Sequence, residues 1–128
     1  MDGNGNSVII GNNVVVNAMK KSKTCFNACG GQSITIEDNC LFSNGIEIHT
    51  TDYHHILYHG VITNHPKSIV IRKHCWIGLK TVILKGVDLA EGTIIGANTI
   101  VTKGVVEKNC VVVGNPAVII KRNINWES

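Results

Sequence analysis

Aromatic side chains and long apolar runs are scarce in this sequence. Phe, Trp and Tyr together make up 5% of the 128 residues, although 44% of them are hydrophobic. No apolar run approaches the roughly 18 residues that cross a bilayer, so membrane insertion is not expected. The first residues, MDGNGNS, have neither the basic nor the apolar region of a signal peptide, which predicts a cytoplasmic location.

Charge is also scarce. Charged residues make up 16% of the sequence, and the net charge of +3 is too small to indicate a nucleic-acid partner. A chain of this length and composition is expected to form one domain over residues 1–128. Among the five cysteines, Cys25 and Cys29 lack the second pair that a four-ligand zinc site needs. The cysteines are therefore expected to be reduced core residues, in a reducing compartment.

The sequence does contain a six-residue period. From Ile71 to Val105 an aliphatic residue leads every hexad: Ile71, Ile77, Ile83, Leu89, Ile95 and Val101. A small or β-branched residue follows four places after each leader. Six residues fit neither the 3.6-residue period of a helix nor the alternation of a strand. The pattern predicts an all-β chain coiled into a triangular prism, with one aliphatic per face pointing inward and three hexads per turn.

The same spacing extends beyond this stretch. Further leaders are predicted at Ile10, Val16, Ile36, Phe42, Ile48, Val106 and Val112. Residues 18–33 break the register and predict an irregular coil with a turn at Gly30 and Gly31. Residues 117–128 are expected to form a short amphipathic tail.

An insertion of about residues 54–70 separates the hexad of Ile48 from that of Ile71. Insertions in coiled repeats project from one side and often carry the function. This one contains His54, His55, His59 and His65, and Asp52 directly precedes it. We therefore expect this insertion to form a protruding loop that carries functional residues.

The residue before each leader is expected to point outward, because neighbouring side chains of a strand face opposite sides. Val82 and Ile100 are one turn apart and should stack on one outer face. An outward apolar patch of this kind predicts association between chains.

The hexads, the segment WIGLKTVILKGVDLAEGTIIGANTIVTKGV and the closing GNPAVIIKR resemble the hexapeptide-repeat acyltransferases of left-handed β-helix fold. IHTTDYHHI resembles the T-D-x-H-x-I stretch of bacterial O-acetyltransferases that modify capsule, lipopolysaccharide or sialic acid. The resemblance covers most of residues 34–126. It implies acetyl-CoA as the acyl donor, a homotrimer, active sites between neighbouring subunits, and a small-molecule or oligosaccharide acceptor. No metal is expected.

Site residues follow from the resemblance by position. His54 matches the catalytic histidine of T-D-x-H, and Trp76 matches the tryptophan of W-I-G beside the thioester. The positions that match the pantetheine, nucleotide and phosphate contacts of the family are Ala97, Thr102, Lys103 and Lys121. Asp52 either caps its corner or orients His54, and the sequence leaves both open. The chain departs from the family pattern at Arg72, Gly104 and Val106.

Two other functions remain open on the sequence alone. His49 and His54 are spaced H-x4-H, which suits a zinc hydratase of the γ-carbonic anhydrase kind. The early coils, however, have no Arg-x-Asp pair of the sort those enzymes contain. The chain could also be a non-catalytic coil that serves as a trimerisation scaffold, and the histidine-rich insertion argues against that.

Overall fold

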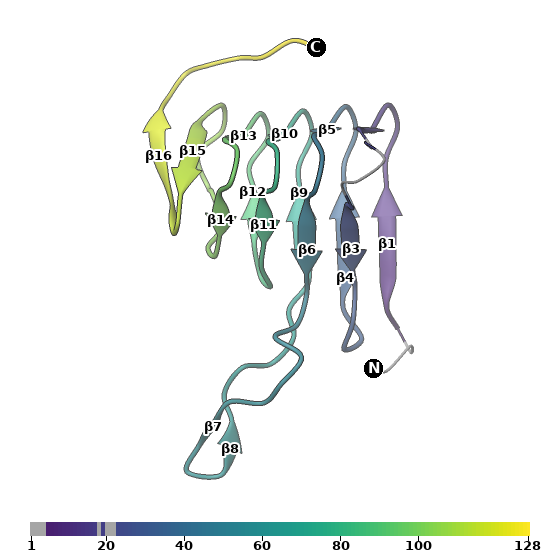
Figure 1. The fold of residues 1–128 in the computed structure, drawn as a ribbon, viewed down its shortest axis with the longest axis vertical. Coiled ribbons are helices and arrows are strands. Elements are labelled where there is room, and N and C mark those ends of the chain that lie inside the picture. Colours follow the sequence, from purple (N-terminus) through teal and green to yellow (C-terminus); the bar gives the residue numbers. More distant parts are fainter. Residues whose placement is uncertain (1–4, 18, 20–22) are drawn as a thin grey trace.

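The computed structural model describes residues 5–17, 19 and 23–128. Over these residues the chain is a left-handed parallel β-helix with three flat faces, which confirms the predicted fold class (Figure 1). Face A contains β1 (Ser7–Ile10), β4 (Ser33–Ile36), β9 (Ile69–Ile71) and β12 (Asp88–Leu89). Face B contains β2 (Val15–Val16), β5 (Leu41–Phe42), β10 (Trp76–Ile77), β13 (Ile94–Ile95), β15 (Val111–Gly114) and β16 (Ala117–Lys121). Face C contains β3 (Cys25–Asn27), β6 (Glu47–His49), β11 (Val82–Ile83) and β14 (Ile100–Val101).

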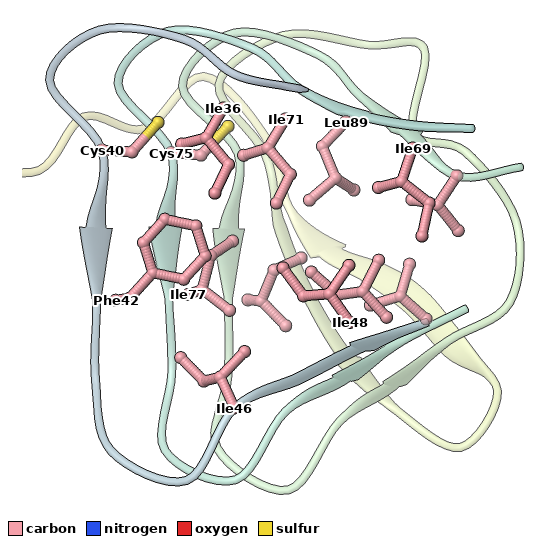
Figure 2. Close-up of a cluster of buried hydrophobic side chains, with 14 of the residues drawn as sticks. Ile36, Cys40, Phe42, Ile46, Ile48, Ile69, Ile71, Cys75, Ile77 and Leu89 are labelled. Carbon is pink, nitrogen blue, oxygen red and sulfur yellow. The ribbon is translucent and has the colours of Figure 1, made fainter. Parts of the chain in front are cut away.

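Apart from β16, each strand of the three faces pairs in parallel with the strand of the same face in the next coil, so the hexad leaders stack in columns. On face B, Phe42, Ile77, Ile95 and Val112 occupy equivalent positions in β5, β10, β13 and β15. Ile48, Ile83 and Val101 do the same on face C. All of these side chains are buried, and Figure 2 shows part of the resulting core, with residues from Ile36 to Leu89 labelled.

The small residues of the repeat belong to the corners. Thr81 is fully buried, and its hydroxyl donates to the carbonyl oxygen of Gly78 at 2.7 Å. A Cβ on Gly78 would lie 2.5 Å from the carbonyl oxygen of Ile95, so a larger residue does not fit between these two coils. Cys40 and Cys75 are buried free thiols, as the repeat predicts. The close spacing of the coils thus explains why small residues recur at these places.

Arg72 occupies a place where the repeat favours a small residue, and it points away from the core. Its guanidinium donates two hydrogen bonds to the Asp88 carboxylate, at 3.0 and 2.8 Å, and lies 3.5 Å from Glu37. The departure from the family pattern therefore produces an ion-pair network on the outside of face A.

The insertion leaves the coil earlier and returns earlier than the sequence predicts. Asp52 lies four places after the leader Ile48, where the repeat predicts a buried small residue. Thr50 is fully buried instead, and Asp52 is exposed. Ile69 is fully buried and already belongs to β9. The protruding segment is therefore 51–68, and it ends in the hairpin of β7 (Leu57–Tyr58) and β8 (Val61–Ile62) (Figure 1).

The segment 18–33 is more regular than predicted where the structure describes it. Phe26 lies in β3 and pairs with Ile48, so it takes a leader position that the sequence reading missed. Gly30 and Gly31 form the expected turn, with φ of 68° and 75°. Residues 18 and 20–22 lie outside the described residues.

The prediction that Val106 leads a hexad is wrong. Its side chain is 95% exposed, whereas Val105 is buried and forms a bridge with Leu89 of face A. The corner after Val101 is shortened by two residues and the next one is lengthened by one. The period alone could not locate this, because only the sum of the two changes is visible in the spacing of Val101 and Val112.

The C-terminal segment divides into two parts. Residues Ala117–Lys121 form β16, which pairs antiparallel with β15 and closes that end of face B. Residues 122–128 then turn back along the stack (Figure 1). The predicted outward stripe is confirmed: Val82 and Ile100 are partners in β11 and β14, and both are partly exposed. None of the described residues forms a helix with the length and apolarity needed to cross a membrane.

Truncation of a true leader should cost much more stability than truncation of Val106. Ile95→Ala removes a buried side chain from the face B column and should lower the free energy of unfolding by about 2–5 kcal/mol. Val106→Ala should change it by no more than about 0.5 kcal/mol, because the side chain is already in solvent. Urea unfolding of the two variants compares these values, and similar losses at both positions would contradict the register described here.

Candidate active site

The root of the protruding loop is fixed to the preceding coil. The Cys29 backbone N–H donates to the Thr50 hydroxyl oxygen at 2.8 Å, and that hydroxyl donates to the Cys29 carbonyl at 2.9 Å. Both residues are buried. The chain thus leaves the β-helix at a defined point, and the residues that follow are held close to the edge between faces C and A.

A polar cluster at the loop root holds the residue before His54. The His49 ring contacts Glu47 through Nε2, at 3.0 Å, and Tyr53 through Nδ1. A carboxylate only accepts hydrogen bonds, so Nε2–H donates to Glu47, and burial raises the pKa of the Tyr53 hydroxyl that contacts Nδ1. Tyr53 has a φ of 67°, a conformation that costs a non-glycine residue about 1–3 kcal/mol. The cluster therefore maintains a strained backbone directly before His54.

His54 presents its imidazole to solvent. The side chain is exposed and has no hydrogen bond or ion pair with any residue that the structure describes. Its backbone, in contrast, is held, because the Asn64 amide donates to the His54 carbonyl oxygen at 2.8 Å. A fixed backbone with an unoccupied imidazole is a suitable arrangement for a group that accepts a proton from a bound substrate.

Asp52 binds the loop to the coil below it. Its carboxylate lies 2.8 Å from the Lys85 ammonium and accepts a hydrogen bond from the Asn64 amide at 3.0 Å. The Lys85 hydrogen bond is the main reason that the pKa of Asp52 is lowered. No hydrogen bond joins Asp52 to His54 among the described residues. Asn64 joins both limbs of the loop, since its side-chain oxygen also accepts from the Ile56 N–H at 2.6 Å.

Lys85 and Asn64 were not singled out from the sequence. The signal for Lys85 was present in the register, because Ile83 stacks directly beneath Ile48 and Lys85 therefore lies beneath the loop root. Asn64 carried no such signal, since its contacts depend on how the loop folds back. His55, His59 and His65 are exposed.

The other residues matched to the family lie in two separate places. Thr102 and Lys103 follow β14 and are exposed on the edge between faces C and A, from which the loop also projects. Trp76 is 37% exposed on the outside of face B, and Ala97 follows β13 at the edge between faces B and C. Lys121 is exposed at the end of β16, also on face B. Face C lies between the two groups, so one chain does not bring them together.

A metal site at His49 is not supported by the local geometry. Both ring nitrogens of His49 are used by protein groups, Glu47 and Tyr53. The described residues contain no group of three or more His, Cys, Asp or Glu side chains arranged to hold a metal ion. The H-x4-H spacing therefore gains no support as a metal site from the described residues.

No family model matches the chain. Among curated proteins it is similar to a polysialic acid O-acetyltransferase of Neisseria meningitidis, with 44% identity over 95 residues, which cover 73% of this chain and 44% of that enzyme. Among solved structures it is similar to the polySia-specific acetyltransferase NeuO, with a TM-score of 0.74 and 31% identity over 96% of this chain and 53% of that one. Galactoside acetyltransferase in complex with coenzyme A has a TM-score of 0.68 and 26% identity over 94% of this chain and 63% of that one. The chain spans about half the length of the relatives that it matches.

The Asp52–Lys85 pair makes a prediction about titration. Because the folded-state pKa of Asp52 is lowered, the pair stabilises the loop above about pH 4, and this contribution is lost as the pH falls through the lowered value. Carboxyl-carbon NMR should place the Asp52 midpoint below the ordinary value of about 3.9. Lys85→Met should raise the midpoint toward that value, and Lys73→Met, on another corner, should not. A midpoint that Lys85→Met leaves unchanged would contradict the pairing.

Proposed function

This chain belongs to the hexapeptide-repeat acyltransferases of left-handed β-helix fold, and we propose that it is an O-acetyltransferase that moves an acetyl group from acetyl-CoA to a sugar hydroxyl. The observation that carries the proposal is His54, an exposed imidazole with no hydrogen-bond partner among the described residues, held on a fixed loop root in a T-D-x-H sequence. The similarity to a polysialic acid O-acetyltransferase and to galactoside acetyltransferase with coenzyme A supports the reaction class and the donor.

In the proposed reaction, His54 acts as the general base. A sugar hydroxyl is too weakly acidic to attack a thioester as an alkoxide at neutral pH, so its proton must leave as the new carbon–oxygen bond forms. An imidazole with a pKa near neutrality is suited to accept it. The carbonyl oxygen of the thioester gains negative charge, which a backbone N–H at a coil corner stabilises. The proton on His54 then passes to the coenzyme A thiolate that leaves.

Asp52 has a positioning role in this proposal. Its carboxylate is occupied by Lys85 and Asn64, and Asn64 in turn holds the His54 backbone. Asp52 therefore acts on His54 through the loop, and not by a direct bond to the imidazole. Among the described residues no Ser or Cys hydrogen-bonds to His54, so the proposed transfer is direct and forms no acyl-enzyme.

The donor site is proposed to lie between two copies of the chain. The His54 group, with Thr102 and Lys103, lies on one edge of face C, and Ala97 lies on the other edge, next to Trp76 on face B. If face C points to a three-fold axis, each copy brings its His54 edge against the opposite edge of its neighbour. Such a head-to-tail contact closes into a ring of three. The apolar pair of Val82 and Ile100 on face C would then be buried at the axis.

In this homotrimer the two groups complete one another. Trp76 and Ala97 of one copy contact the thioester and the pantetheine, and Thr102 and Lys103 contact the nucleotide end. Lys121 is proposed to lie near the phosphates.

Loss of His54 should remove catalysis but leave the donor site intact. His54→Ala is expected to lower the transfer rate by about 10²–10⁴, the usual contribution of a general base. Acetyl-CoA affinity, measured by calorimetry, should be unchanged, because the imidazole acts on the acceptor proton. His55→Ala is the matched control, one residue further along the same exposed loop, and should retain full activity. Near-native turnover by His54→Ala, or acetylated protein accumulating without acceptor, would refute this mechanism.

Mixed trimers test whether the site is shared between copies. Differently tagged His54→Ala and Trp76→Ala chains, each inactive alone, should regain activity when co-expressed and purified through both tags. In a shared site, one of the three sites in each doubly tagged trimer, about a third, receives both native residues. Doubly tagged trimers that stay as inactive as the parents would show that His54 and Trp76 do not meet across subunits, and a doubly tagged species that never forms would count against the trimer itself.

A further inference from the structure

A hollow of about 490 Å³ lies at the edge between faces A and B, between the first coils and the C-terminal tail. Its volume is within the range of about 300–1,000 Å³ that small-ligand sites occupy. Its lining includes Asn13, Asn39, Leu41, Trp126 and Glu127. None of these residues has a part in the proposed donor site, so the hollow needs an explanation of its own.

The tail that forms one wall of the hollow is held by specific contacts. The Trp126 indole N–H donates to the His74 carbonyl oxygen at 2.8 Å, and His74 Nε2 donates to the Trp126 carbonyl oxygen at 3.0 Å. The two rings stack with centroids 4.2 Å apart and an angle of 6°. The Ile124 N–H also donates to the Asn109 carbonyl at 3.0 Å. The wall is therefore an ordered part of the fold.

The hollow adjoins the residue proposed to lie beside the thioester. The ring centroids of Trp76 and Trp126 are 6.0 Å apart, and Leu41 is the partner of Trp76 in the pairing of β5 with β10. The proposed donor residue Ala97 lies on the opposite side of Trp76, beyond β13 and toward the C-terminal coils. The attacking hydroxyl must lie near both the thioester carbon and His54, and the hollow borders Trp76, beside which both are proposed to lie.

We propose that this hollow is the acceptor subsite and that it binds a neutral sugar ring. The proposal rests on the function proposed above. An indole offers an apolar face to the carbon–hydrogen face of a sugar, and it contributes contact area at low entropic cost. The amides of Asn13 and Asn39 each offer both a donor and an acceptor, which suits neighbouring hydroxyls.

The charge of the lining sets the expected specificity. Glu127 is an acidic residue, and no Lys or Arg is among the described residues that line the hollow. A carboxylated sugar would place its charge near Glu127 without a cationic partner, which is unfavourable. The hollow therefore favours a neutral hexose over a sialic acid, and in this respect the chain is inferred to differ from relatives whose acceptor is polysialic acid.

Ligand-observed NMR on the intact protein, without acetyl-CoA, tests the subsite directly. Methyl galactoside, methyl glucoside and N-acetylglucosamine are the neutral probes, and the methyl glycoside of N-acetylneuraminic acid is the charged one. At least one neutral probe should bind, and the charged probe should bind about tenfold more weakly or not at all. Binding of the charged probe as tightly as any neutral one, or binding of none of the four, overturns the proposal.

Three variants assign the binding to this hollow. Asn39→Gly removes an amide at a residue with a φ of 62°, so the backbone conformation is retained. It should weaken neutral-sugar binding about tenfold, and Trp126→Ala should do so at least as much. Glu127→Lys should admit the charged probe. If Asn39→Gly and Glu127→Lys both bind the four probes as the native chain does, the hollow is not the subsite.

The acetyl-CoA affinity of the same variants separates this inference from the function on which it rests. It should be unchanged in Asn39→Gly and Glu127→Lys, because neither residue belongs to the proposed donor site. If the native chain binds and uses acetyl-CoA while the variants leave the acceptor KM unchanged, the subsite is wrong and the function stands. If the native chain does not bind acetyl-CoA, the proposed function fails, whatever the sugars do.

Discussion

The inward stacking of one aliphatic side chain per face, coil upon coil, is the constraint on which the rest of this structure depends. Neighbouring side chains of a strand point to opposite sides. Because Ile77 is buried, Trp76 lies on the outside, and because Ile83 is buried, Val82 does too. The core register thus decides which residues reach the surface and at what height along the stack. Even the protruding loop obeys it, because the chain leaves at buried Thr50 and returns at buried Ile69.

Much of this fold could be predicted from spacing alone, and the misses have a common cause. A period reports which side chains point inward, but it does not report how long each corner is. Val106 was assigned to the core because a shortened corner and a lengthened one nearly cancel in the sequence. Asp52 was assigned to a small-residue slot because the chain was expected to complete a hexad that it leaves at Thr50. Phe26 was missed because its hexad follows a longer corner.

The candidate site could be predicted only in part. His54 and Trp76 were found through a sequence resemblance, which carries roles but no contacts. Three sets of contacts could not be read from the sequence, because they depend on how the chain folds. They are the Asp52–Lys85 pair, the Glu47–His49–Tyr53 cluster and the packing of Trp126 on His74. The arrangement of the matched residues on the two sides of face C was equally invisible in the sequence. That arrangement is what makes a second copy of the chain necessary in the proposed mechanism.

The central claim is that the reaction takes place at a boundary between copies, with His54 of one facing Trp76 of the next. A crystal structure of the protein with coenzyme A tests it most directly. The account predicts a three-fold assembly in which the thiol end of coenzyme A lies between Trp76 of one copy and the loop that carries His54 of its neighbour. Coenzyme A held by a single copy, or an assembly in which His54 and Trp76 line different spaces, would contradict it.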